Sequence, residues 1–244
     1  MDRNFMMGFF LLQNLDTKHV GETFKEACTS NNIAWLRSYL SLRKTDPSVG
    51  ENEMLRYAVA KNCPHAVELL LADPRVDPSC WENAPIRLAA MVGYVSVVKL
   101  LLAHPRVDPS DNLNEAMESA LSEGHVEVAE ELWKHPRFAP SVGGNELLVF
   151  ATRRGYVSAV RRLLQHPRFE PKRDLTFCVA EAIAGDQVPI LELLLAQIAP
   201  KVPKYQMVLH AVEHNSASCL RLLLQAMKGK PIQYKNKALN LAAK

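Results

Sequence analysis

The amino-acid sequence predicts an all-α solenoid in which short helix-turn-helix units stack one after another. A proline-containing segment recurs at a step of 31 residues, in the copies Asp73-Pro-Arg-Val-Asp-Pro-Ser79, His104-Pro-Arg-Val-Asp-Pro-Ser110, His135-Pro-Arg-Phe-Ala-Pro-Ser141 and His166-Pro-Arg-Phe-Glu-Pro171. Alanine follows the same step at Ala27, Ala58, Ala89, Ala120, Ala151 and Ala182, and then recurs at Ala211 and Ala242. A constant period of this length is typical of repeat architectures, in which each unit buries its apolar surface against its neighbours.

The turn between the two helices of each unit follows four residues after the recurring alanine. Glycine, asparagine or aspartate stands at this place, in Asn31, Asn62, Gly93, Gly124, Gly155, Asp186 and Asn215. These residue types adopt a left-handed backbone at the lowest cost, so they predict the end of one helix and the start of the next. Apolar residues then recur at helical spacing, as at Val98 and Leu101, until Pro105 ends the second helix. The small alanine allows a neighbouring helix to approach closely, and the leucines fill the gap to the next unit.

The repeat divides the chain into three predicted parts. Residues 1–20 form an N-terminal capping segment, residues 21–230 form the array, and residues 231–244 form a truncated C-terminal repeat or cap. The array has about seven repeats, at about 21–46, 47–77, 78–108, 109–139, 140–170, 171–199 and 200–230. In the capping segment, the apolar residues between Phe5 and Leu12 favour an amphipathic helix that covers the first repeat. A docking motif for a partner is the alternative for this segment.

Composition bounds the classes to which the protein can belong. The apolar stretch near the start is eight residues long, whereas a bilayer span needs roughly 20, so no membrane association is expected. The five cysteines are scattered and lack the C-x-x-C spacing of a zinc site, which favours reduced structural thiols. We therefore expect an intracellular protein in the cytoplasm, with the nucleus as the alternative.

The positive charge of the chain is concentrated near its C-terminal end. Residues 196–244 carry eight Lys or Arg and one acidic residue, a net charge of +7, in a chain whose total is +3. A solvated cap is the favoured interpretation, and a nuclear-import or anion-binding patch is the alternative. Only Tyr205 and Tyr234 lie among these basic residues, so a stacking surface for nucleic-acid bases is not supported.

Two segments carry a resemblance to a known family. Ala84-Pro-Ile-Arg-Leu-Ala-Ala90 and the segment from Gly93 to Leu102 resemble the T-P-L-H-x-A-A and G-H-x-x-x-V-x-x-L-L segments of the ankyrin repeat family, and Gly124-His-Val-Glu-Val128 is similar to the second. The unit is 31 residues rather than the usual 33 of the family, and its loop reads D-P-S-x-x-x-N. The resemblance therefore implies an ankyrin-like helix stack with short loops instead of full β-hairpin fingers and no regular sheet.

In an ankyrin-like stack, positions that vary between repeats are free to carry recognition, and we expect them to line the concave face. The candidate partner-binding residues are Trp81, Met91, Val92, Asp111, Asn112, Arg153 and Arg154. Trp81, Met91 and Val92 are expected to lie close together. An aromatic side chain beside apolar groups is the composition of a binding hot spot. Arg153 and Arg154 would anchor an acidic partner segment. The alternative for Trp81 is that it packs only on its own loop.

The histidine and arginine of the loops also recur in register. For His104, His135 and His166 we favour a role as partly cationic helix C-terminal caps over metal binding, because equivalent positions in stacked units lie roughly 8–10 Å apart. The arginines that follow are Arg75, Arg106, Arg137 and Arg168. Local pairing with the acidic residues two places on, Asp77, Asp108 and Glu170, is favoured over an anion-binding stripe.

These patterns predict a non-catalytic scaffold that binds a protein partner through the concave face and loops of a monomeric repeat array. No nucleophile, general base and orienting acid can be placed together, and no phosphate-binding glycine motif is present, so we expect neither catalysis nor a cofactor nor a metal. One alternative is a substrate-recruiting or regulatory subunit of an enzyme complex, such as a ubiquitin ligase adaptor. Another is nucleic-acid binding through the basic C-terminal region.

Overall fold

The protein consists of stacked helix pairs, as shown by a computed structural model that describes residues 24–41, 46–170, 175–197 and 204–226. Every regular element within these residues is a helix, which confirms the predicted all-α repeat fold with short loops. The chain forms two compact units, Met1–Phe138 and Ala139–Lys244. The predicted capping segment 1–20 and the C-terminal part 231–244 lie outside the described residues.

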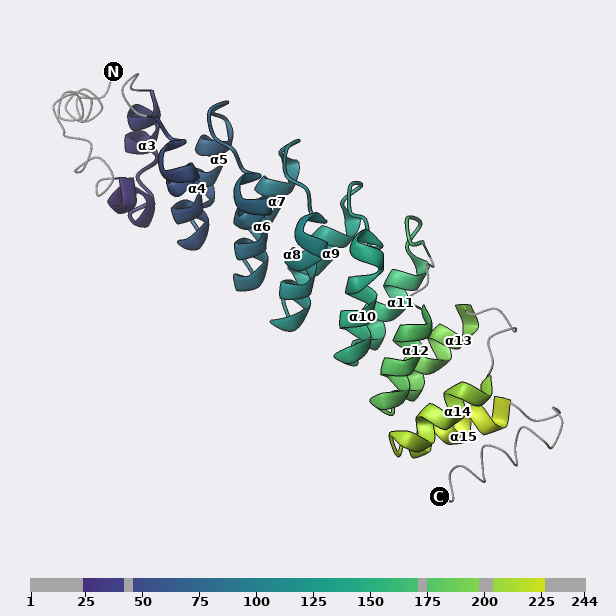
Figure 1. The fold of residues 1–244 in the computed structure, drawn as a ribbon. Helices are drawn as coiled ribbons and strands as arrows, with labels where there is room; N and C mark the ends of the chain where they lie inside the picture. The colour runs from purple at the N-terminus through teal and green to yellow at the C-terminus, as the bar shows by residue number, and fades with distance from the viewer. Residues whose placement is uncertain (1–23, 42–45, 171–174, 198–203, 227–244) are drawn as a thin grey trace. The chain divides into compact units, whose positions relative to one another are not determined.

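The first unit contains two rows of helices (Figure 1). Its first-helix row consists of α4 (Val49–Ala60), α6 (Cys80–Val92) and α8 (Asp111–Ser122), in which each helix packs against the next. The second-helix row consists of α3 (Ile33–Leu40), α5 (Pro64–Leu71), α7 (Val95–Ala103) and α9 (Val126–Lys134). A helical segment at residues 24–29 precedes α3.

The second unit repeats the same arrangement. The short 3₁₀ helix η1 (Val142–Gly144) leads into α10 (Glu146–Arg153), which packs against α12 (Leu175–Ala184), and α12 packs against α14 (Lys204–Glu213). The second helices are α11 (Val157–Gln165), α13 (Val188–Gln197) and α15 (Ala217–Ala226), which also pack in sequence.

The two sequence columns that predicted the fold have the expected structures. The recurring alanines from Ala27 to Ala211 are buried, with at most 5% of the surface of any of them exposed. All seven turn residues have left-handed backbone angles, at Asn31, Asn62, Gly93, Gly124, Gly155, Asp186 and Asn215.

The thiols of Cys28, Cys63, Cys178 and Cys219 are buried, and burial raises the pKa of Cys28 and Cys219 to about 12.

A feature that was predicted as loop is a short left-handed turn at the start of the first helices of the first unit. In α4, α6 and α8, three successive residues have positive φ: Gly50-Glu51-Asn52, Trp81-Glu82-Asn83 and Asn112-Leu113-Asn114. The N–H of each asparagine donates to the carbonyl four residues earlier, as from Asn83 to Ser79 at 3.1 Å. For most residues other than glycine and asparagine, this conformation raises the free energy of the folded chain by roughly 1–2 kcal/mol per residue. Other contacts must therefore stabilise the turn.

The asparagine that closes each left-handed turn provides one of these contacts. Asn83 is 3% exposed, and its amide oxygen accepts the backbone N–H of Asp108 in the following loop at 2.9 Å. Asn52 makes the equivalent contact with the N–H of Asp77 at 2.7 Å. In α4 and α6, the D-P-S-x-x-x-N motif therefore joins the first helix to the loop that leads into the next repeat.

We expect Asn83→Ala to lower the free energy of unfolding by about 2–4 kcal/mol, because it leaves the Asp108 N–H without its acceptor and puts alanine at a positive φ. Urea unfolding followed by circular dichroism measures the change. The matched control is Asn112→Ala, which has the same left-handed backbone but an exposed side chain, and it should cost about 1 kcal/mol. Equal losses in the two variants would contradict a stabilising role for the buried amide.

Candidate functional site

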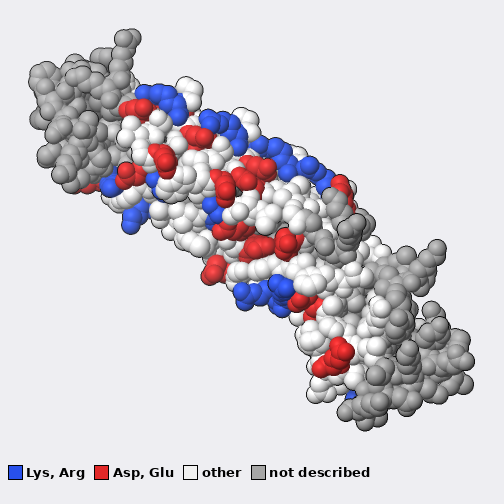
Figure 2. Space-filling view, in the orientation of Figure 1, with Lys and Arg blue, Asp and Glu red and all other residues white. Residues whose placement is uncertain are grey.

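Charge is distributed unevenly over the first unit. The first-helix row, α4, α6 and α8, carries six acidic side chains (Glu51, Glu53, Glu82, Asp111, Glu115 and Glu118) and two basic ones (Arg56 and Arg87), a net charge of −4. Figure 2 shows acidic side chains over these helices, whereas basic side chains follow the edge at which Figure 1 places the loops between repeats. The first-helix row and the loop edge are therefore electrostatically different surfaces.

Trp81 is the largest exposed apolar side chain of the first-helix row, with 52% of its surface exposed. The guanidinium carbon of Arg56, from the preceding repeat, lies 3.8 Å from the centre of the indole ring, within the range of a cation–π interaction. The indole Nε1–H donates to the Glu51 carboxylate. Trp81 therefore packs on its neighbouring repeat, not on its own loop alone, and its ring is held in place while half of it faces solvent.

A second set of contacts connects Trp81 to the next repeat. Arg87 donates from Nη2 to the carbonyl oxygen of Trp81 at 3.0 Å and forms an ion pair with Glu115. The same carboxylate accepts the side-chain N–H of Asn112, and the Asp111 carboxylate accepts Nδ2 of Asn83 at 2.6 Å. Of the predicted partner-binding residues, Trp81, Asp111 and Asn112 thus belong to one network across α6 and α8.

Met91 and Val92 do not lie beside Trp81, contrary to the sequence-based expectation. They occupy the last turn of α6, separated from the left-handed turn by about 10 Å of helix at a rise of 1.5 Å per residue. Both are exposed, at 47% and 39%, and the carbonyl of Met91 lies 3.1 Å from Nε2 of His125 in the next repeat. They belong to the row of turns between first and second helices.

In the second unit, Arg153 and Arg154 are exposed, but each has a partner within the array. The guanidinium of Arg153 forms two hydrogen bonds with the Glu181 carboxylate, at 3.0 and 3.1 Å, and lies 5.4 Å from the ring centre of Phe177. Arg154 lies 5.8 Å from the ring centre of Phe150. A partner carboxylate would therefore compete with Glu181 for Arg153.

The charged side chains that surround Trp81 were not among the predicted site residues, although the sequence contains a signal for them. Ion pairs on first helices join residues 28 apart: Lys25 with Glu53, Arg87 with Glu115, and Arg153 with Glu181. This separation is one repeat of 31 less about one helical turn, so it brings a residue opposite a neighbour one turn earlier on the next first helix. Opposite charges at this separation predict contacts between repeats.

Comparison with known proteins identifies the repeats. Residues 55–142 match the family model of ankyrin repeats, in three copies. These residues are ankyrin repeats. The crystal structure of the ankyrin repeat domain of Bcl-3, a member of the IkappaB protein family, has a similar fold, with a TM-score of 0.57 and 18% sequence identity over 72% of this chain and 86% of that domain. No curated protein sequence matches the chain significantly.

The ankyrin fold supports a general role as a protein-interaction scaffold, since stacked repeats present extended binding surfaces. Within the residues that the structure describes, no helix is long and apolar enough to cross a membrane. The same residues contain no group of three or more His, Cys, Asp or Glu side chains that could hold a metal ion.

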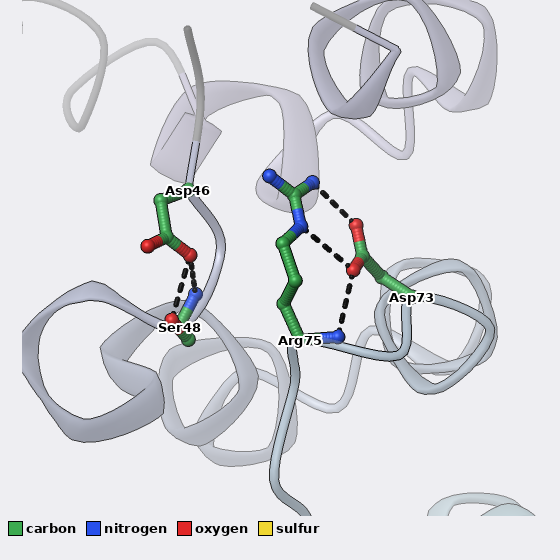
Figure 3. Close-up of polar contacts among 4 residues, drawn as sticks. All are labelled: Asp46, Ser48, Asp73 and Arg75. Carbon is green, nitrogen blue, oxygen red and sulfur yellow. Dashed lines mark hydrogen bonds and ion pairs between the residues drawn. The ribbon is translucent and has the colours of Figure 1, made fainter. Parts of the chain in front are cut away.

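The loops between repeats use side-chain acceptors for backbone N–H groups. The Asp46 carboxylate accepts the N–H and hydroxyl of Ser48 at 3.0 and 2.6 Å, and the Asp73 carboxylate accepts the Arg75 N–H at 3.0 Å (Figure 3). The hydroxyl and N–H of Ser48 lower the pKa of Asp46, and the guanidinium of Arg75, together with its backbone N–H, lowers the pKa of Asp73. His104, His135 and His166 occupy the place of Asp73 in later repeats, and each accepts the N–H two residues on at Nδ1, at 3.2 Å.

These histidines are C-cap residues, as predicted, but the expected partial positive charge is wrong. Burial and the neighbouring arginines lower the pKa of all three, so the neutral imidazole is favoured. Protonation would also convert the accepting Nδ1 into a donor.

Arg106 and Arg137 of the loop edge contact the preceding repeat, and neither Arg75 nor Arg106 has the predicted partner two places on. Arg106 pairs with Asp77 of the preceding loop at 2.7 Å, and Arg137 donates from Nη2 to the carbonyl of His104 at 3.0 Å. Arg75 pairs with Asp73, two places before it. Surface ion pairs of this kind each contribute little to the free energy of unfolding.

Stability should fall as the pH falls below the ordinary histidine pKa of 6.5, because the unfolded chain then binds more protons than a folded state in which these pKa values are lowered. Replacing His104, His135 and His166 by asparagine keeps an acceptor that does not titrate. Urea unfolding at pH 7.5 and 5.5 should show a smaller pH dependence in this triple variant. An unchanged dependence would locate the acid-sensitive groups elsewhere.

Two turn glycines of the ankyrin repeats allow a matched test. A Cβ at Gly93 would lie 2.6 Å from Nδ1 of His125, whereas a Cβ at Gly124 would meet no atom within 4 Å. Both glycines have positive φ, so Gly124→Ala should lower the free energy of unfolding by about 1 kcal/mol. Gly93→Ala should lower it by at least about 1 kcal/mol more, because its Cβ would also clash with His125. Thermal or urea unfolding measures the difference, and similar costs would show that His125 moves away freely.

Proposed function

We propose that the chain is a non-catalytic scaffold that binds a protein partner through the first-helix row and left-handed turns of its ankyrin array. One observation carries this proposal: Trp81 is half exposed, yet Arg56, Glu51 and the backbone contact with Arg87 hold it in place. A fixed, exposed aromatic loses little conformational freedom on binding, which is the property of a binding hot spot.

Leu113 extends this surface into the next repeat. It is 48% exposed and lies in the left-handed turn of α8, which packs directly against α6. Asp111 and Asn112 flank it in the same turn. Two apolar side chains in adjacent repeats, with polar groups around them, have the composition of an interface core and its rim.

The finer predictions remain part of the proposal. The array acts as a monomer inside the cell, and the buried, protonated thiols of Cys28 and Cys219 are suited to a reducing compartment. Arg153 and Arg154 form a secondary contact region in the second unit. A role as a recruiting subunit of an enzyme complex would use the same surface, and the partner's identity decides between the two.

We expect a double variant, Trp81→Ala with Leu113→Ala, to weaken binding of a partner at least about tenfold, because each change removes an exposed apolar anchor. Partners would be captured from lysate, purified, and measured pairwise against the intact chain by calorimetry. Circular dichroism and urea unfolding verify that the variants are folded.

Val126→Ala is the matched control, since Val126 is 70% exposed in the same unit but lies at the start of α9, in the second-helix row. It should leave the affinity unchanged. If the control weakens binding as much as the double variant, the first-helix row is not the site.

A further inference from the structure

The charge of the first-helix row limits the kind of partner that it can bind. Its net charge of −4 contrasts with the +3 of the whole chain. An acidic segment laid along this row would meet like charges, whereas a basic segment would meet opposite ones, and such complementarity governs both association rate and partner choice.

The surroundings of Trp81 place negative charge beside an aromatic ring. Arg56 lies over one face of the indole at 3.8 Å, and 52% of the surface of Trp81 remains exposed. Glu51 holds the Nε1 edge, and Glu82, the next residue in the chain, is exposed. Glu82 forms no ion pair within the described part of the first unit.

The basic residues of the row are already engaged, whereas part of its acidic charge is not. Arg87 pairs with Glu115, and the Arg56 guanidinium donates from Nη2 to the carbonyl of Gly50 at 2.9 Å and stacks on Trp81. Neither arginine is free to receive a carboxylate from outside without loss of a contact that holds Trp81. The row therefore offers the Glu82 carboxylate and the half-exposed indole of Trp81, and both attract cations.

We propose that the first-helix row of the first unit binds a basic peptide segment of the protein partner, with an arginine or lysine of that segment on the half-exposed indole of Trp81 and beside Glu82. This inference rests on the proposed function and adds the chemical class of the partner. Binding of this kind weakens as salt rises, because the charges are exposed and screened.

The test uses the full chain and a fluorescently labelled, terminally blocked peptide of alternating arginine and serine, with a glutamate-serine peptide of the same length as the opposite probe. Fluorescence anisotropy at low and at physiological salt measures the affinity. We expect the basic peptide to bind and the acidic one not to bind, with the affinity for the basic peptide falling several-fold between the two salt concentrations.

Charge reversal at Glu82 distinguishes binding at this site from nonspecific electrostatic binding of the peptide elsewhere on the protein. Glu82→Lys should lower the affinity for the basic peptide at least about threefold, and Trp81→Ala should lower it about tenfold. Glu127→Lys, an equal change of charge at an exposed position on α9, should have no comparable effect. Circular dichroism verifies that each variant is folded.

Equal effects of Glu82→Lys and Glu127→Lys, binding of the acidic peptide, or failure of both peptides to bind would each overturn the inference. If partner binding still depends on Trp81 and Leu113 but the basic peptide does not bind, the proposed function stands and only the predicted class of partner is wrong. If partner binding is also independent of these residues, both proposals fail.

Discussion

The contact on which the stacking of α4 and α6 in the first unit depends is the hydrogen bond between a buried asparagine and the loop of the following repeat. Asn52 and Asn83 each close a left-handed turn at the start of a first helix and accept a backbone N–H 25 residues later. Asn52 and Asn83 are 6% and 3% exposed, and a buried polar group without a partner costs roughly 1–3 kcal/mol. This contact therefore fixes both the end of the loop and the direction in which the next repeat begins. In the second unit, Ser141 has taken over the accepting role, since its hydroxyl accepts the Glu170 N–H at 2.9 Å.

The strained turn that this asparagine closes also determines where Trp81 lies. A tryptophan at positive φ is uncommon, and it persists only where its surroundings fix the backbone. Asn83 fixes the C-terminal end of the turn, and the contact of Arg87 with the Trp81 carbonyl at 3.0 Å fixes its start. The side chain is therefore directed by backbone geometry, and its contacts with Arg56 and Glu51 only complete its placement.

The parts of the structure that were predictable from sequence are those set by local rules repeated in every unit. The alanine and turn columns predicted the helix pairs because each position has one local requirement, a small side chain or a left-handed backbone. The expected closeness of Trp81 and Met91 was wrong because variable positions were grouped by their order in the chain, whereas the rise of α6 separates them. The partner of Arg106 was misassigned for a related reason, since Asp77 faces it only through the stacking of repeats.

The left-handed turns were not predictable from residue preference, because Glu51, Trp81 and Leu113 all avoid this conformation. What recurs is the asparagine at the third place, together with the D-P-S segment before it. Once these fix the turn, its first two places are free to change, and the chain uses glycine, tryptophan, glutamate, asparagine and leucine there. The same constraint that joins the repeats thus leaves two exposed positions at the start of α4, α6 and α8, where the backbone direction is set but the residue type is not. This is the condition under which a repeat array can change partner without changing its fold.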